Sequence, residues 1–144
     1  MASMRLEIVT AERLVYSEDV DVLVAPGIDG ELGILPSHAP LLTMLKPGEI
    51  KVVREGEESF IAVGGGFLEV LGDKVTILAD TAEHAEEIDL QRSEEALQRA
   101  QESVSASASD ADLERAVASM RRSQARLKVA RRRRRPREGP TAPS

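Results

Sequence analysis

The sequence contains no cysteine and no tryptophan, and it has one tyrosine and two phenylalanines among 144 residues. Without cysteine the chain cannot form a disulfide framework, a thiolate nucleophile or a cysteine-based metal site, which fits a reducing compartment. It also lacks an apolar run of the roughly 20 residues that cross a bilayer, and its first residues show neither a signal peptide nor a transit peptide. We therefore expect no direct membrane insertion, so that any contact with a membrane is made through a partner.

Groups that carry out catalysis are also scarce. The two histidines, His38 and His84, lie far apart in the sequence, and neither has a cluster of possible metal ligands beside it. The acidic residues of the first 85 positions are spread along the chain rather than paired as a general acid and base, and no serine shows a triad pattern. We expect a protein with no active site, no metal site and no required cofactor.

One stretch of the chain has no acidic residue. Residues 115–137 hold 11 Lys and Arg and no Asp or Glu, whereas residues 1–85 hold 6 basic and 15 acidic residues, and residues 86–114 hold 2 basic and 9 acidic residues. Charge runs are typical of solvated faces, but an acidic body with a basic end also indicates a partner of opposite charge.

Residues 1–85 have the pattern of short β-strands. Apolar and polar residues alternate from Arg5 to Thr10, and turn residues at 55–58 and at Gly72-Asp73 separate further apolar segments, as in hairpins. Another turn is predicted at Lys46-Pro47-Gly48, and Gly64-Gly65-Gly66 indicates a bend or bulge where strands approach closely. We expect an antiparallel β-sandwich across residues 1–85.

The apolar period changes after residue 85. Apolar or small residues recur every three or four positions from Leu90 to Val104 and again from Leu113 to Leu127, which predicts two helices separated by the serine-rich residues 103–109. The capping candidates are Asp89 for the first helix, and Ser109 or Asp110 for the second. We expect an antiparallel helical hairpin over residues 86–130, marginally stable because its stripes are thin.

The last residues, 131–144, combine six arginines with prolines and have no apolar side chain large enough to build a core. We expect a disordered basic tail. The predicted fold class is therefore α+β, with a β-sandwich, then a two-helix hairpin, then this tail.

The stretch from Asp29 to Pro40 places two glycines and two prolines around a short apolar run. This spacing indicates an ordered loop with a specific shape, in which Leu32, Ile34 and Leu35 should be buried; a tight turn between two strands is the simpler interpretation. Its sequence Gly-Glu-Leu-Gly-Ile-Leu-Pro-Ser-His-Ala-Pro, with Gly-Gly-Phe-Leu-Glu-Val further along, resembles the epsilon subunit of the bacterial rotary ATP synthase.

The resemblance implies a central-stalk subunit that couples and regulates but does not catalyse, on the cytoplasmic face of the inner membrane. Its partners would be the gamma subunit, the membrane ring of c subunits through the region of Glu31 and His38, and the catalytic beta subunits with alpha. The second helix would extend and inhibit ATP hydrolysis. Its contact residues would be Arg121, Arg122, Arg126 and Lys128.

A second motif resembles the ATP-binding signature of that family. It consists of Ile88, Asp89 and Arg92, with Arg122 and Arg126 one helical turn apart, and Ser93 stands where the family has alanine. Arginines on two packed helices can grip phosphates, so ATP is expected as a possible regulatory ligand. The alternative, which the sequence leaves open, is that Asp89 only caps the helix and that the arginines are ordinary surface residues.

A soluble nucleic-acid- or nucleotide-binding module that uses the arginine-rich tail is the alternative from another class. The acidic body and the near absence of aromatic residues argue against nucleic acid as a partner. The resemblance favours an acidic protein partner instead.

Overall fold

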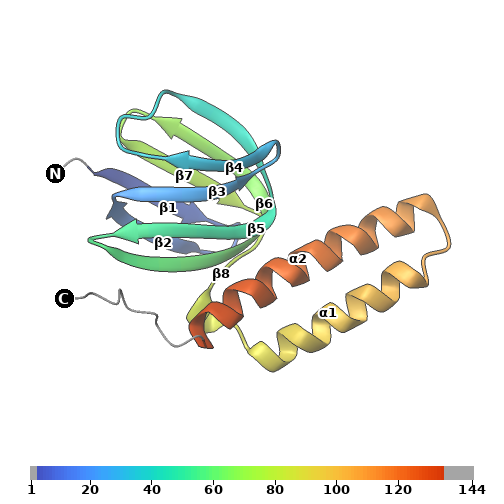
Figure 1. Ribbon diagram of the computed structural model, residues 1–144. Coiled ribbons are helices and arrows are strands. Elements are labelled where there is room, and N and C mark those ends of the chain that lie inside the picture. The colour runs from blue at the N-terminus through green and yellow to red at the C-terminus, as the bar shows by residue number, and fades with distance from the viewer. Residues whose placement is uncertain (1–2, 135–144) are drawn as a thin grey trace.

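The computed structural model describes the backbone of residues 3–134 and the side chains of residues 3–132. A sheet structure is followed by a pair of antiparallel helices that lie along one side of it (Figure 1). The elements are β1 (Met4–Val9), β2 (Leu14–Val20), β3 (Val22–Gly27), β4 (Gly30–Ile34), β5 (Leu41–Arg54), β6 (Glu57–Leu71), β7 (Lys74–Ala79), β8 (Ala82–His84), the 3-10 turn η1 (Ala85–Glu87), α1 (Leu90–Ser105) and α2 (Asp110–Arg134). The predicted α+β fold is confirmed.

The strands form one sheet that folds over into two layers. Its order is β2-β1-β7-β6-β5-β3-β4, with β8 added to β6. The C-terminal half of β6 pairs with β7, and its N-terminal half pairs with β8, so the long strands β5 and β6 belong to both layers. We call the layer of β2, β1, β7 and the adjoining halves of β6 and β5 the first layer, and the layer of β4, β3, β8 and the other halves the second. All pairs but β1–β7 are antiparallel.

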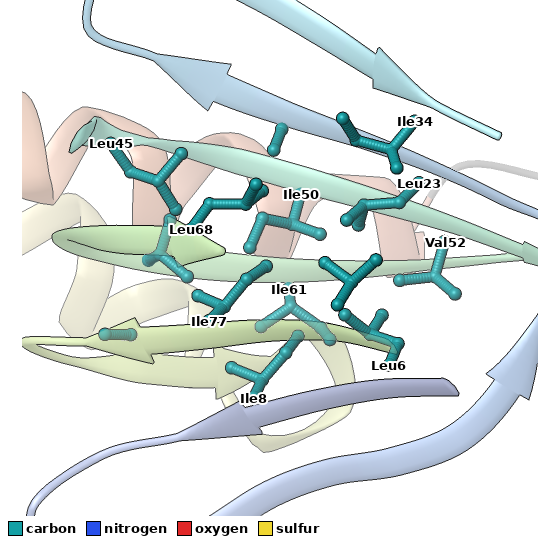
Figure 2. Close-up of a cluster of buried hydrophobic side chains, with 14 of the residues drawn as sticks. Leu6, Ile8, Leu23, Ile34, Leu45, Ile50, Val52, Ile61, Leu68 and Ile77 are labelled. Atoms are coloured by element: carbon teal, nitrogen blue, oxygen red, sulfur yellow. The ribbon is translucent and has the colours of Figure 1, made fainter. Parts of the chain in front are cut away.

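The core lies between the two layers. Alternate residues of each strand point into it, as the strand period requires, and Figure 2 shows aliphatic side chains from both layers meeting there. Leu6, Ile8, Leu23, Ile34, Ile50, Ile61, Leu68 and Ile77 are completely buried. Each such side chain contributes about 1.5–3 kcal/mol by leaving water. This core belongs entirely to residues 1–85, although the independence of that segment as a domain stays a prediction.

The long strands bend where glycine and proline face each other. Pro47 pairs with Gly64, and Leu45 pairs with Gly66, so β5 continues through the segment predicted as a turn. That prediction was wrong because β3 shifts register between Val24 and Gly27, which removes the need for the hydrogen bond that Pro47 cannot donate. The close approach predicted at the glycine run is confirmed: a Cβ on Gly66 would lie 2.2 Å from the Leu78 carbonyl oxygen.

The hairpin has the predicted caps. Asp89 Oδ1 accepts a hydrogen bond of 3.0 Å from the Arg92 amide at the start of α1, and Ser109 Oγ accepts one of 3.1 Å from the Asp112 amide at the start of α2. The helix α2 continues to Arg134, so the predicted end at Ala130 falls inside it. The disordered tail was predicted to begin at residue 131, but residues 131–134 belong to α2; the rest of it, from residue 135 onward, lies outside the described residues. None of the described helices is long and apolar enough to cross a membrane.

Helix α2 packs on the outer face of the second layer. Val129 and Ala130 are fully buried there against Ala62, Ala85 and Ile88, with Phe60 and Leu90 packed beside them. Four of the buried residues are Ala or Val, so the apolar contact that holds the hairpin to the sandwich is thin. The outer face of the first layer has no helix over it in the described structure (Figure 1).

Candidate functional site

The segment that carries the predicted contact residues was expected to be a loop, but Gly30–Ile34 form the strand β4 and only the residues after it turn as a loop. Glu31 is exposed on β4 and pairs in register with Pro26, while the His38 amide donates a 3.1 Å hydrogen bond to the Leu35 carbonyl across a tight turn in which Ser37 has φ 68°. Ile34 is buried and Leu32 half-buried, but Leu35 is exposed, which contradicts its predicted burial. The loop therefore offers an apolar side chain beside the polar Glu31 and His38.

A row of apolar side chains, all exposed except the half-buried Val9, crosses the outer face of the first layer. Pairing in register places Met44 beside Phe67, Phe67 beside Leu78, Leu78 beside Val9, and Val9 beside Leu14. We call these five residues the apolar row. Phe67 is 49% exposed and Leu78 57%, although both are large and apolar. Leu42 and Leu71 are exposed two and four positions along their strands on the same face.

Exposed apolar side chains that gather on one face mark an interaction site, whereas single ones need no explanation. Sequence reasoning missed the apolar row, although a signal was present. Residues 66–71 are almost continuously apolar, and a strand of that kind is apolar on both faces.

The basic residues of α2 divide into two flanks along the line where α2 lies on the sheet. Arg122 and Arg126 line a narrow cleft of about 160 Å³ together with Glu83 of β8. Arg121 and Lys128 line a wider one of about 600 Å³ on the other side, with Glu49 of β5. Arg121 and Arg122 make no ion pair with the described residues, whereas Arg126 and Lys128 do.

Two bidentate ion pairs join α2 to the sandwich. Arg126 donates from Nε and Nη2 to the Glu83 carboxylate at 2.8 and 3.1 Å. Arg132 donates from the same two atoms to the Glu49 carboxylate at 2.9 and 2.8 Å, and its guanidinium lies 4.6 Å from the centre of the Phe60 ring. The hydrogen bonds with Glu49 raise the pKa of Arg132, outweighing the opposite effect of its partial burial. Sequence reasoning missed both carboxylates.

The residues of the ATP-binding signature do not meet in one cleft. Ile88 and Asp89 line an open cleft of about 700 Å³ beside Glu86 and Glu94, away from the cleft that holds Arg122 and Arg126. The Arg92 side chain is exposed, and the Arg92 backbone amide donates a hydrogen bond to the capping carboxylate of Asp89. The buried Ser93 hydroxyl donates to the Asp89 carbonyl at 2.8 Å, so it is satisfied within its own helix. The nucleotide site stays a prediction.

Comparisons with known proteins decide the family. The model of the β-sandwich domain of the ATP synthase delta/epsilon chain matches residues 3–85, and the model of the long α-helix domain of the same chain matches residues 86–131. The chain belongs to the delta/epsilon chain family of ATP synthase.

Relatives of the delta/epsilon chain family agree with the match. The ATP synthase epsilon chain of Dehalococcoides mccartyi is 60% identical over 96 residues, which cover 67% of this chain and 69% of that protein. The epsilon chain of Chloroflexus aurantiacus is 58% identical over 93 residues, 65% of this chain and 67% of that one. A chain of the mitochondrial ATP synthase of Euglena gracilis, solved with F1 and the c-ring, has a TM-score of 0.77 at 26% identity, covering 90% of this chain and 82% of that chain.

This family assignment accounts for the resemblance seen in the loop around Glu31 and His38. It gives no support to the alternative of a nucleic-acid-binding module. Among the described residues, no three His, Asp or Glu side chains gather as a metal site. The surfaces that remain to be explained on this member of the family are therefore the loop, the apolar row and the basic flanks of α2.

Proposed function

We propose that the chain is a non-catalytic rotor subunit of the central stalk, which couples the ring of c subunits to the gamma subunit at the cytoplasmic face of the inner membrane. The observation that carries the proposal is the apolar row, an exposed apolar surface on the face opposite the hairpin. The gamma subunit would cover this surface. The loop with Glu31, His38 and the exposed Leu35 would meet the c-ring.

The second part of the proposal is that α2 inhibits ATP hydrolysis when the hairpin extends toward the catalytic beta and alpha subunits. Residues 115–137 carry 11 positive charges and no negative one, far more than solubility requires. At 1.5 Å per residue, about 40 helical residues reach roughly 60 Å, enough to span from the foot of a stalk to the head above it. Each exposed ion pair with an acidic loop contributes only about 0.2–1 kcal/mol, so several must act together.

Removing four of these charges tests the inhibitory role. We expect the quadruple variant Arg121→Ala, Arg122→Ala, Arg126→Ala, Lys128→Ala to raise the ATPase activity of the assembled, membrane-extracted complex about threefold or more, because even 0.7 kcal/mol of lost inhibition is about threefold. Raising the ionic strength should reduce the difference from wild type, since the Debye length shrinks to about 3 Å at 1 M salt. The measurement is steady-state ATP hydrolysis.

A matched control removes positive charge from elsewhere. The variant Lys51→Ala, Arg54→Ala, Arg99→Ala takes three cations from the sandwich and from α1 and should leave hydrolysis unchanged. If the quadruple variant assembles normally and hydrolyses ATP at the wild-type rate, the inhibitory role of α2 is wrong.

We also propose ATP as a regulatory ligand of the folded hairpin, bound by Arg122 in the cleft beside Glu83. Arg92 and the Ile88-Asp89 turn lie outside this cleft, and Arg126 is paired with Glu83. Support comes from Arg122, which faces a cleft without an ion pair to the described residues. A ligand that binds only the folded hairpin stabilises it by linkage, by about 2.7 kcal/mol at 100 times its Kd. Millimolar Mg-ATP should therefore raise the melting temperature of the full chain by several degrees, and Arg122→Ala should remove the shift, whereas Arg99→Ala should keep it. No shift for the wild-type chain would reject the site.

A further inference from the structure

Two carboxylates of the sandwich face α2 from opposite sides. With 3.6 residues per turn, Ala125 and Val129 of α2 lie on the face toward the sheet, Arg122 and Arg126 on one flank, and Arg121, Lys128 and Arg132 near the other. Ala125 and Val129 are buried, which agrees with this orientation. Glu83 meets the first flank through Arg126, and Glu49 meets the second through Arg132, with Lys128 Nζ 3.7 Å away.

These ion pairs are stronger than ordinary surface pairs for two reasons. Both are bidentate, which adds geometric specificity as well as energy. The Glu49 side chain is only 10% exposed, so its carboxylate is largely withdrawn from water and depends on the two cations of α2 for compensation. Arg132 also lies over the Phe60 ring, which fixes the guanidinium in place.

The apolar contact beneath α2 is too small to make these pairs redundant. Four of its five buried residues are Ala62, Ala85, Val129 and Ala130; Ile88 is the fifth, and Phe60 and Leu90 are only partly buried beside them. Small side chains remove little apolar area from water when they pack, so burial contributes correspondingly little. The carboxylates therefore decide whether the hairpin stays on the sandwich.

We propose that Glu49 and Glu83 act as an internal substitute for the acidic partner of α2, holding the hairpin folded by occupying the cations that the partner would bind. This inference rests on the inhibitory role of α2 stated above. A guanidinium fork serves one carboxylate in bidentate geometry at a time, so Arg126 cannot pair with Glu83 and with a partner at once. Release from the two carboxylates and binding to the partner are then one exchange of ion pairs.

Opening of the hairpin can be measured on the isolated full chain. Because the sequence has no cysteine, fluorescent dyes can be attached at two introduced ones, Asp73→Cys in the β6–β7 turn and Ala108→Cys in the loop between the helices. We expect the double variant Glu49→Gln, Glu83→Gln to raise the ratio of open to folded hairpin at least about tenfold, read from energy transfer between the dyes. The matched control, Glu7→Gln, Glu18→Gln, removes two carboxylates paired with Lys74 and Arg54 within the sandwich and should leave the ratio unchanged.

Competition with an acidic partner is tested with a short polyglutamate peptide as the probe. If only the open hairpin binds the peptide, its apparent Kd falls in proportion to the rise in the open fraction. We expect the Glu49→Gln, Glu83→Gln variant to bind at least about tenfold tighter than wild type. Exchanging the two members of one ion pair, Glu49→Arg with Arg132→Glu and Glu83 kept, should restore an ion pair at that position. Its energy transfer should therefore be closer to the wild-type value than that of the Gln variant.

Equal energy transfer in wild type and the Gln variant, or equal peptide affinity, would overturn the proposal. The assembled complex separates this outcome from failure of the inhibitory role. There the Gln variant should hydrolyse ATP more slowly than wild type, opposite in sign to removal of the α2 cations. If the Gln variant opens and binds the peptide more tightly but leaves ATP hydrolysis unchanged, the exchange of ion pairs is supported and the inhibitory role of α2 is contradicted.

Discussion

We expect the substitution Phe67→Glu to weaken binding of the purified gamma subunit about 100-fold or more. Phe67 lies inside the apolar row, with Met44 on one side and Leu78 on the other, and it is the one aromatic residue of the row. Truncating a central aromatic anchor of an interface costs about 2 kcal/mol or more, and a carboxylate forced into an apolar contact adds its own desolvation. Since 1.4 kcal/mol is tenfold, the sum reaches two orders of magnitude. Titration calorimetry with the gamma subunit measures it.

The control for this prediction is Leu113→Glu. Leu113 is also an exposed apolar residue, at 41%, but it lies in the first turns of α2 rather than on the sheet. The same change of chemistry there should leave the affinity within about twofold of wild type. Phe67→Glu should also melt near the wild-type temperature, because the ring is already half exposed. Wild-type affinity in a folded Phe67→Glu variant would show that gamma binds elsewhere.

We expect Gly66→Ala to destabilise the sandwich by about 3 kcal/mol or more, through strain and overpacking together. Gly66 has φ +145°, a conformation that other residues rarely adopt, and a Cβ there would lie 2.2 Å from the Leu78 oxygen and 2.8 Å from Ala79 Cα. These are backbone atoms of the paired strand β7, so they cannot turn aside as a side chain could. At about 4–8 °C per kcal/mol, the melting temperature should fall by roughly 12–24 °C.

Two other glycines separate the causes of this loss. Gly72→Ala places a Cβ in open space but at φ +61°, so it should show the backbone strain alone, about 1 kcal/mol. Gly33→Ala meets neither obstacle and should change stability by less than about 0.5 kcal/mol. Circular dichroism melts of the three variants rank them. If Gly66→Ala has the same melting temperature as Gly33→Ala, then β6 and β7 can move apart at this position without loss of stability, and the prediction is wrong.

The local structure was determined by the sequence itself. The two helices begin at Asp89 and Ser109 because these side chains cap the backbone amides of the next turn, and the hairpin at Gly72 turns because glycine there has φ +61°. The turn from Leu35 to His38 was likewise predictable, because Pro36 restricts the backbone there, whereas the strand β4 at Gly30–Ile34 was not. Each of these features depends on interactions between residues a few positions apart, which a single sequence displays.

The tertiary structure alone decided the surfaces. The apolar row joins residues from five strands, and only the register of the pairs brings Leu14, Val9, Leu78, Phe67 and Met44 into line. Pro47 continues a strand because its neighbour β3 shifts register there, and Leu35 is exposed because the loop turns it outward. Glu49 and Arg132 are 83 residues apart in the sequence. Glu49 forms an ion pair with α2, rather than remaining a solvated charge, only because the fold packs α2 against β5. Pairings over such distances follow from how the layers pack, and no local pattern of residue types specifies them.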